Sequence, residues 1–147
     1  MRIHGEWHWS ESSGLVPRLH AEIRTGDGRW VPTPFLVDTG AERSVFSYEV
    51  LDALQLDAEP SDGTYLTGVG GTSATILVAT KIRLQATDGQ LANVNGIYYA
   101  FTDPISLDLC ILGRDVLSNF AVIVDRPGNQ ILLLARDHRY HVMPAVS

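Results

Sequence analysis

One aspartate, Asp38, stands where an apolar run ends, in the stretch "PFLVDTGA". Apolar runs of this length are typical of buried strands, in which aspartate is rare unless it has a partner. The Thr39 hydroxyl that follows can donate and accept hydrogen bonds, and Gly40 lets a second backbone approach closely. A carboxylate fixed in such a loop can act as a general base, whereas its simplest structural role is that of a turn residue.

A second candidate for chemistry is the glycine-rich run from Gly68 to Gly71. A phosphate-binding loop needs a helix after the glycines, with N-terminal amides that face the anion. Here the strand-like patterns "TYL" and "ATILVA" flank the run, so a hairpin tip explains it better. Taken alone, the pattern is that of a plain solvent-exposed hairpin.

The remaining reactive residue types form no recognisable site. The five histidines are scattered, and no third ligand accompanies His4 and His8, so we expect no metal site. The single cysteine, Cys110, lies in the apolar stretch "LDLCILG" and is expected to be a buried core residue. No Gly-x-Ser-x-Gly element supports a serine triad, and no cofactor is expected.

Composition limits the function classes further. A chain of 147 residues, 45% hydrophobic and 19% charged, suits one soluble globular domain. The net charge of −6 argues against binding to nucleic acids or anionic membranes. No apolar run has the length of a membrane span and no signal region opens the chain, so the cytoplasm is the expected location.

The elements that must position Asp38 are mostly strands. Alternating apolar residues around Leu19 to Ile23 and several later runs indicate short strands at regular spacing. Two short helices are expected, one capped by Ser47 and one over 114–120. This pattern predicts a mainly β fold, a barrel or a sandwich. Turns are expected at Asp27-Gly28, Asp62-Gly63, Gly68 to Gly71, Asp88-Gly89, Asn95-Gly96 and Asp125 to Asn129.

The chain is expected to contain one domain over residues 15–136. Residues 1–14 are set apart as an N-terminal extension of uncertain order, and residues 137–147 as a C-terminal tail. The stretch "SSGLVPR" (residues 12–18) matches a thrombin-cleavable linker, and the sequence fits both a native and an introduced origin.

Three motifs in order resemble those of one family. "FLVDTGA" closely resembles the active-site motif of aspartic proteases, and "CILGRDVL" resembles the second signature of their retropepsin-like group. Between them, "TYLTGVGGTSATI" occupies the place of the flap, the hairpin that closes over the substrate in this group. The resemblance covers roughly residues 15 to 135 and implies a closed retropepsin-like β-barrel with a flap hairpin and one or two short helices.

The resemblance also implies a role for each matching residue. It makes Asp38 the catalytic aspartate, with Thr39 interlocking the two active-site loops and Gly40 binding the substrate backbone. Substrate-binding positions are Ala41, Glu42, Gly68, Val69, Gly70 and Gly71. Gly113 and Arg114 support the site. Because a cation at a helix start gains nothing from the helix dipole, we expect Arg114 to pair with Glu42.

The implied activity is peptide hydrolysis by two carboxylates that share one proton around a water molecule. The chain has one Asp-Thr-Gly, so a homodimer must supply the second Asp38, and "QILLLA" (residues 130–135) is the candidate interface strand. The expected partners are a peptide or protein substrate and a second copy. The alternatives are a non-catalytic dimeric module for peptide binding or assembly, and an unrelated β-barrel binding protein.

Overall fold

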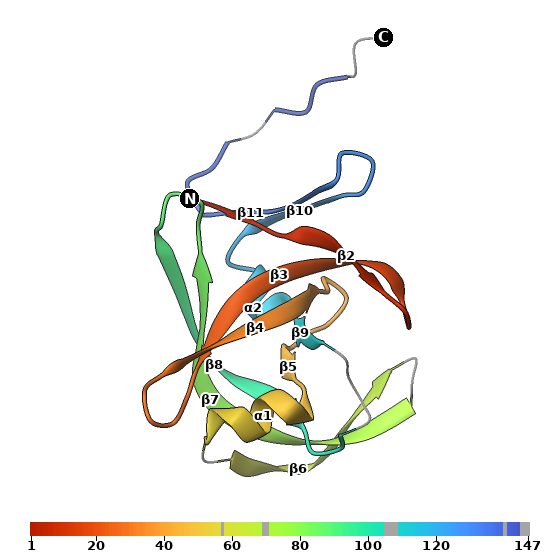
Figure 1. The fold of residues 1–147 in the computed structure, drawn as a ribbon, viewed down its shortest axis with the longest axis vertical. Helices are drawn as coiled ribbons and strands as arrows, with labels where there is room; N and C mark the ends of the chain where they lie inside the picture. Colours follow the sequence, from red (N-terminus) through yellow and green to blue (C-terminus); the bar gives the residue numbers. More distant parts are fainter. Residues whose placement is uncertain (57, 69–70, 105–108, 140, 145–147) are drawn as a thin grey trace.

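The computed structural model describes residues 1–56, 58–68, 71–104, 109–139 and 141–144, with the backbone alone for 58–68 and 71–73. Strands dominate, as the sequence predicts (Figure 1). They are β1 (Arg2–His4), β2 (Glu6–Ser10), β3 (Gly14–Arg24), β4 (Trp30–Val37), β5 (Val45–Phe46), β6 (Ala58–Gly68), β7 (Gly71–Gln85), β8 (Leu91–Phe101), β9 (Cys110–Leu112), β10 (Ala121–Asp125) and β11 (Gln130–Leu134). The helices are α1 (Tyr48–Leu54) and α2 (Arg114–Leu117). No helix in the described ranges is both long and apolar enough to cross a bilayer.

The main sheet closes into a ring around the core. Its strand order is β2-β3-β4-β9-β5-β8-β7-β6, and an additional antiparallel pairing of β3 with β7 joins the two sides. Alternate side chains of β3 and β4 are buried inside the ring. Fully buried residues there include Leu19, Ile23, Phe35, Tyr98 and Leu112. The ring gives the loop after β4 a rigid base.

A separate three-stranded sheet, ordered β1-β11-β10, lies at one end of the ring (Figure 1). The small sheet shares its core with the ring. Its buried residues there include Ile3 of β1 and both Ile131 and Leu133 of β11. Residues 1–14, set apart above as an extension, thus contribute β1 and β2 to the two sheets.

The strand expected to form the dimer interface, "QILLLA", lies inside the small sheet, and its role at an interface stays a prediction. β11 is the central strand of the small sheet, paired with β1 on one edge and β10 on the other. Its apolar side chains are used inside the chain, because strand β11 must cover the end of the core. Within the described part of the chain, the two outer strands of this sheet are β1 and β10.

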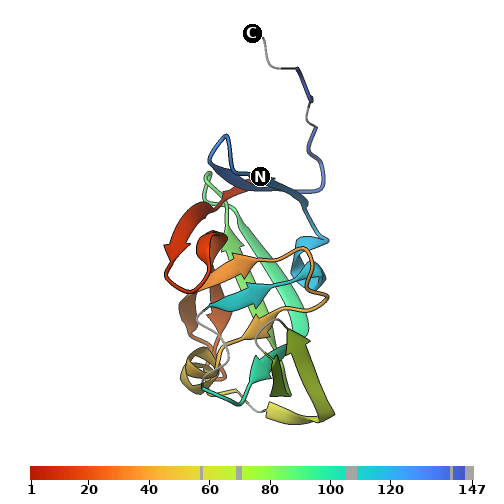
Figure 2. The same ribbon diagram turned by 90° about the vertical axis from the view of Figure 1, so that its right-hand side faces the viewer.

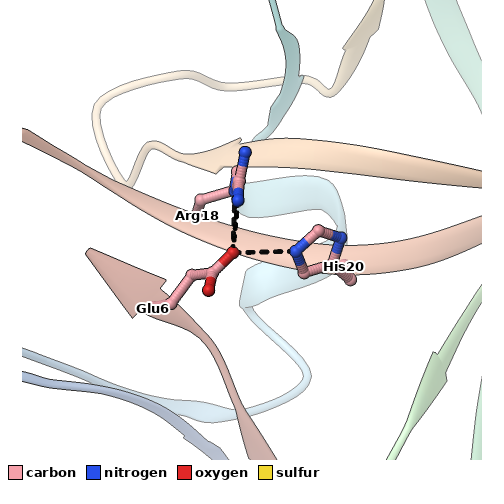
Figure 3. Close-up of polar contacts among 3 residues, drawn as sticks. All are labelled: Glu6, Arg18 and His20. Carbon is pink, nitrogen blue, oxygen red and sulfur yellow. Dashed lines mark hydrogen bonds and ion pairs between the residues drawn. The ribbon is translucent and has the colours of Figure 1, made fainter. Parts of the chain in front are cut away.

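Strand β2 is tied to β3 by a cluster of three polar side chains (Figure 3). The Glu6 carboxylate accepts a hydrogen bond from Nε of Arg18 at 3.0 Å and lies 2.8 Å from Nε2 of His20. The Arg18 hydrogen bond, and then that of His20, hold the pKa of Glu6 below its ordinary value of 4.5. The folded state therefore favours the charged form of this carboxylate.

Replacing Glu6 with glutamine should make stability less dependent on pH. A lowered folded-state pKa stabilises above the unfolded pKa, and this contribution disappears as pH falls through the folded value. Because the cluster is exposed, we expect a Tm about 2 °C lower at pH 7 and a smaller difference at about pH 3. Glu11→Gln, in the adjacent turn, is the control. A Tm difference that stays constant from pH 7 to pH 3 would contradict this.

The strand break expected at Asn95-Gly96 is wrong, because β8 runs through both residues. Gly96 serves close packing: a Cβ atom there would lie 2.7 Å from Cζ of Tyr98. The Tyr98 hydroxyl donates to the Val94 carbonyl at 2.8 Å. Burial, with a smaller contribution from the Asp115 charge, raises the pKa of Tyr98 well above its usual range. Gly96 is therefore a core-packing residue.

Both expected helices are present. The Ser47 hydroxyl caps α1 by accepting a hydrogen bond from the Val50 N–H at 3.4 Å, and Leu54 is fully buried. Cys110 is a core residue as expected, and burial raises the pKa of its thiol. Helix α2 ends at Leu117 rather than at Phe120, whose ring still packs on the core.

Candidate active site

Asp38 lies directly after β4, at the start of a tight turn. Its Oδ1 accepts a hydrogen bond from the Gly40 N–H at 2.9 Å, and its carbonyl accepts one from the Ala41 N–H at 3.2 Å. Oδ2 has no hydrogen-bond partner among the described residues. The half-buried carboxylate is thus fixed through one oxygen and leaves the other for a ligand.

The strand before Asp38 is held by a parallel partner. Strands β4 and β9 pair in the register Phe35↔Cys110 to Val37↔Leu112. The Asp38 N–H continues this ladder by donating to the Leu112 carbonyl at 3.1 Å. Because both strands run parallel, their carboxyl ends meet. The first and second sequence signatures therefore lie side by side.

Backbone hydrogen bonds join the two signatures beyond the strands. The Arg114 N–H donates to the Ala41 carbonyl at 2.9 Å, and the Asp115 N–H donates to the Glu42 carbonyl at 3.2 Å. Gly113 permits this approach, since a Cβ atom there would lie 2.6 Å from the carbonyl carbon of Arg43. Gly113 supports the site through the space it leaves free.

The expected pairing of Arg114 with Glu42 is wrong. The Arg114 guanidinium instead donates from Nη1 to the Thr39 carbonyl at 3.0 Å, and no ion pair joins it to Glu42 within the described part of the chain. The Glu42 carbonyl accepts a hydrogen bond from the Asp115 N–H of α2, and the Glu42 side chain is exposed. Arg114 still reaches back to the Asp38 turn, but it holds a carbonyl there rather than a carboxylate.

Two residues outside the expected set complete this junction, Ser44 and Asp115. The Asp115 carboxylate accepts from the Ser44 N–H at 3.0 Å and from the Ser44 hydroxyl at 2.7 Å. The same hydroxyl accepts from the Gly113 N–H at 2.9 Å. Ser44 is 0% exposed, so these bonds satisfy groups removed from water. In the sequence, this junction is marked by a single serine before the buried pair Val45-Phe46.

The hairpin expected to act as a flap is present. Strands β6 and β7 pair antiparallel, with Tyr65↔Ala74 and Leu66↔Ser73 in register, and the last pair is Gly68↔Gly71. Val69 and Gly70, the expected tip, lie outside the described residues. The strand break expected at Asp62-Gly63 is wrong, because β6 runs through both residues with a register shift between Pro60 and Tyr65.

The hairpin and the Asp38 turn face the same way. In both views, the paired ends of β6 and β7 lie on the same side of the molecule as the loop between β4 and β5 (Figures 1 and 2). The β2–β3 hairpin and the β10–β11 turn also reach this side in Figure 1. One side of the molecule therefore carries the carboxylate and the hairpin.

The site offers one carboxylate and rigid backbone dipoles. Thr39 and Gly40 are exposed beside Asp38, where another chain can reach them. No cluster of three metal-ligating side chains occurs within the described ranges. A single fixed carboxylate can take a proton from water, but it cannot also donate one to a carbonyl at the same moment.

Solved structures share this fold. A retropepsin-like aspartic protease from Rickettsia conorii superposes with a TM-score of 0.54 at 17% identity, covering 90% of this chain and 90% of that one. The protease of EIAV, solved with the inhibitor HBY-793, gives a TM-score of 0.51 at 22% identity and covers 74% of this chain and 91% of that one. The fold is therefore that of the retropepsin-like proteases. No curated protein sequence matches the chain.

The family follows from the sequence itself. The family model for aspartyl proteases matches residues 21–116, which include the Asp38 turn, the β6–β7 hairpin and the second signature. The chain belongs to the aspartyl protease family. Membership supports a hydrolase at the level of the family.

Proposed function

We propose that the protein is an aspartic endopeptidase that hydrolyses peptide bonds as a homodimer. The observation that carries this proposal is the state of the Asp38 carboxylate, which is held through Oδ1 while Oδ2 is left without a partner among the described residues. The turn that holds it is fixed by β9 and α2, so the oxygen has a defined position. Preorganised groups of this kind are what catalysis requires.

The chemistry needs two such carboxylates. In this family's mechanism, one carboxylate removes a proton from water while the other donates a proton to the scissile carbonyl. Two like charges about 3 Å apart cannot both be ionised, so the pair holds one shared proton. The β6–β7 hairpin closes over the peptide and limits access of water. The reaction requires no metal or cofactor.

The second carboxylate comes from the partner of a two-fold dimer. Exposed Thr39 and Gly40 allow the two Asp38 turns to meet, with the Thr39 hydroxyls interlocking them. The edge strand β10 offers unpaired backbone groups to the same partner, since β11 occupies only its other edge. Strand β10 follows α2 after three residues, so the edge and the site are closely linked in the chain.

A charge on this edge should separate the subunits. Val124 of β10 is 46% exposed, and Val124→Glu places one added negative charge on each of the two edges that meet. We expect the dimer dissociation constant to rise at least about tenfold, with activity lost at low protein concentration. Sedimentation velocity and peptide cleavage over a dilution series measure both effects.

The control for this variant is Leu91→Glu. Leu91 is 48% exposed and begins β8, a strand of the main sheet that does not pair with β10. Its replacement should leave the dissociation constant unchanged. If both variants associate as the wild type does, β10 is not the interface strand.

The activity is tested by cleavage of a peptide library from acid to neutral pH. The wild type should cut peptides, and the Asp38→Ala variant should not. Peptide binding by both proteins without any cleavage would indicate a non-catalytic binding module instead.

A further inference from the structure

An arginine lies five positions after Asp38, in the loop that carries the site. Arg43 is exposed, and the backbone on either side of it is fixed. On one side, the Asp115 N–H donates to the Glu42 carbonyl; on the other, the Tyr99 N–H donates to the Ser44 carbonyl at 3.2 Å. The side chain of Arg43 therefore starts from a rigid point.

The guanidinium is also held in place, and by neutral groups alone. Nη1 donates to the Ile97 carbonyl at 3.2 Å, and the guanidinium carbon lies 5.6 Å from the centre of the Tyr99 ring. Within the described part of the chain, Arg43 has no carboxylate partner. A positioned guanidinium with unused donors is suited to bind a carboxylate in two parallel hydrogen bonds.

The two partners of Arg43, Ile97 and Tyr99, both belong to β8. Tyr99 pairs with Leu77 in the sheet, and Leu77 belongs to β7, the strand that runs from the hairpin end at Gly71. Tyr99 also pairs with Val45, the residue that follows Ser44. Arg43 lies in the loop between β4 and β5. This loop and the paired ends of β6 and β7 are on the same side of the molecule (Figure 1), so a peptide held between the hairpin and Asp38 would run along the loop.

We propose that Arg43 determines substrate specificity by selecting an acidic side chain near the scissile bond. This inference rests on the proposed function and names a property of its substrate. The chain carries a net charge of −6, so its overall charge does not attract acidic peptides. The selection must come from local contact, because charges beyond about 8 Å are screened at physiological salt.

The reach of the loop limits the position of that acidic residue. Five residues span at most about 17 Å when fully extended, and a bound strand advances about 3.3 Å per residue. The acidic residue therefore lies within about five residues of the cleaved bond.

Labelled decapeptides with one apolar centre test this inference. The set carries Glu, Gln or Lys at a single position, up to five residues from the central bond on either side. At the preferred position, the wild type should cleave the Glu peptide with a kcat/KM about tenfold above that of the Lys peptide. Arg43→Gln should remove this difference while cleavage of the Gln peptide continues, and Arg43→Glu should reverse it.

Arg24→Gln is the matched control, because Arg24 is also exposed and its guanidinium lies 5.7 Å from the centre of the Trp30 ring. That variant should keep the preference for Glu. A preference unchanged in Arg43→Gln, or lost equally in Arg24→Gln, would overturn the inference.

A binding measurement separates this inference from the proposed activity. Fluorescence anisotropy of the same peptides on the Asp38→Asn protein reports recognition without cleavage. If the wild type cleaves no peptide but binding still prefers Glu in an Arg43-dependent manner, the activity proposal fails and the role of Arg43 stands. If cleavage occurs and neither measurement distinguishes Glu from Lys, the role of Arg43 is refuted.

Discussion

Replacing Asp38 with asparagine should lower kcat for peptide cleavage by about a thousandfold or more, because the dyad loses both its base and its shared proton. Stability should change little. The asparagine side-chain oxygen can still accept the hydrogen bond from the Gly40 N–H that Oδ1 accepts in the native turn. Urea unfolding together with steady-state cleavage distinguishes a chemical loss from a structural one.

Mixing experiments then test whether two chains form one site. With a ninefold excess of the Asp38→Asn protein, random association leaves about one wild-type subunit in ten with a wild-type partner. Activity per wild-type chain should therefore fall about tenfold. An Asp38→Asn protein that also carries Val124→Glu should suppress activity less, because each heterodimer then has one added charge at the edge that the subunits share. Full activity of a monomer, shown by sedimentation at the assay concentration, would refute the shared dyad.

Replacing Asp115 with alanine should cost about 3 kcal/mol of unfolding free energy. The Asp115 carboxylate is the acceptor for both the N–H and the hydroxyl of Ser44, which is fully buried. Each buried donor left without an acceptor costs about 1–3 kcal/mol. Asp115→Asn keeps one acceptor oxygen and should be intermediate. Chemical denaturation of the three proteins measures the series.

Asp52→Ala is the control for the loss of a carboxylate. Asp52 is exposed on α1, where a substitution usually changes stability by no more than about 0.5 kcal/mol. If Asp115→Ala is no more destabilising than this control, the junction of Ser44 and Asp115 does not hold the two signatures together. Activity measured well below the Tm should fall only in the Asp115 variants, since they alone loosen the Asp38 turn.

The sequence was informative where local chemistry decides the structure. A carboxylate at the end of an apolar strand, followed by small residues, located the Asp38 turn. Ser47 marked the start of α1, and Asp27-Gly28 and Asp88-Gly89 marked hairpin turns, with Gly28 and Gly89 at positive φ. In each case a backbone requirement selects the residue type.

The failures share a different cause. Gly96 resembles a turn glycine, but a ring two residues away requires its missing side chain. Arg114 was expected to pair with the Glu42 carboxylate, whereas its guanidinium binds the Thr39 carbonyl in the Asp38 turn. These outcomes depend on which segments become neighbours in space, and residue type alone does not determine that.

The small sheet has a consequence for how activity is controlled. Its three strands come from one chain, and Ile3, Ile131 and Leu133 complete the same core as the ring. A subunit therefore needs no partner strand to finish its fold, and a separated subunit should stay native. Dilution of the proposed homodimer would then produce folded but inactive subunits, which regain activity when they associate again. Abundance, rather than refolding, would set how much protease is at work at any moment.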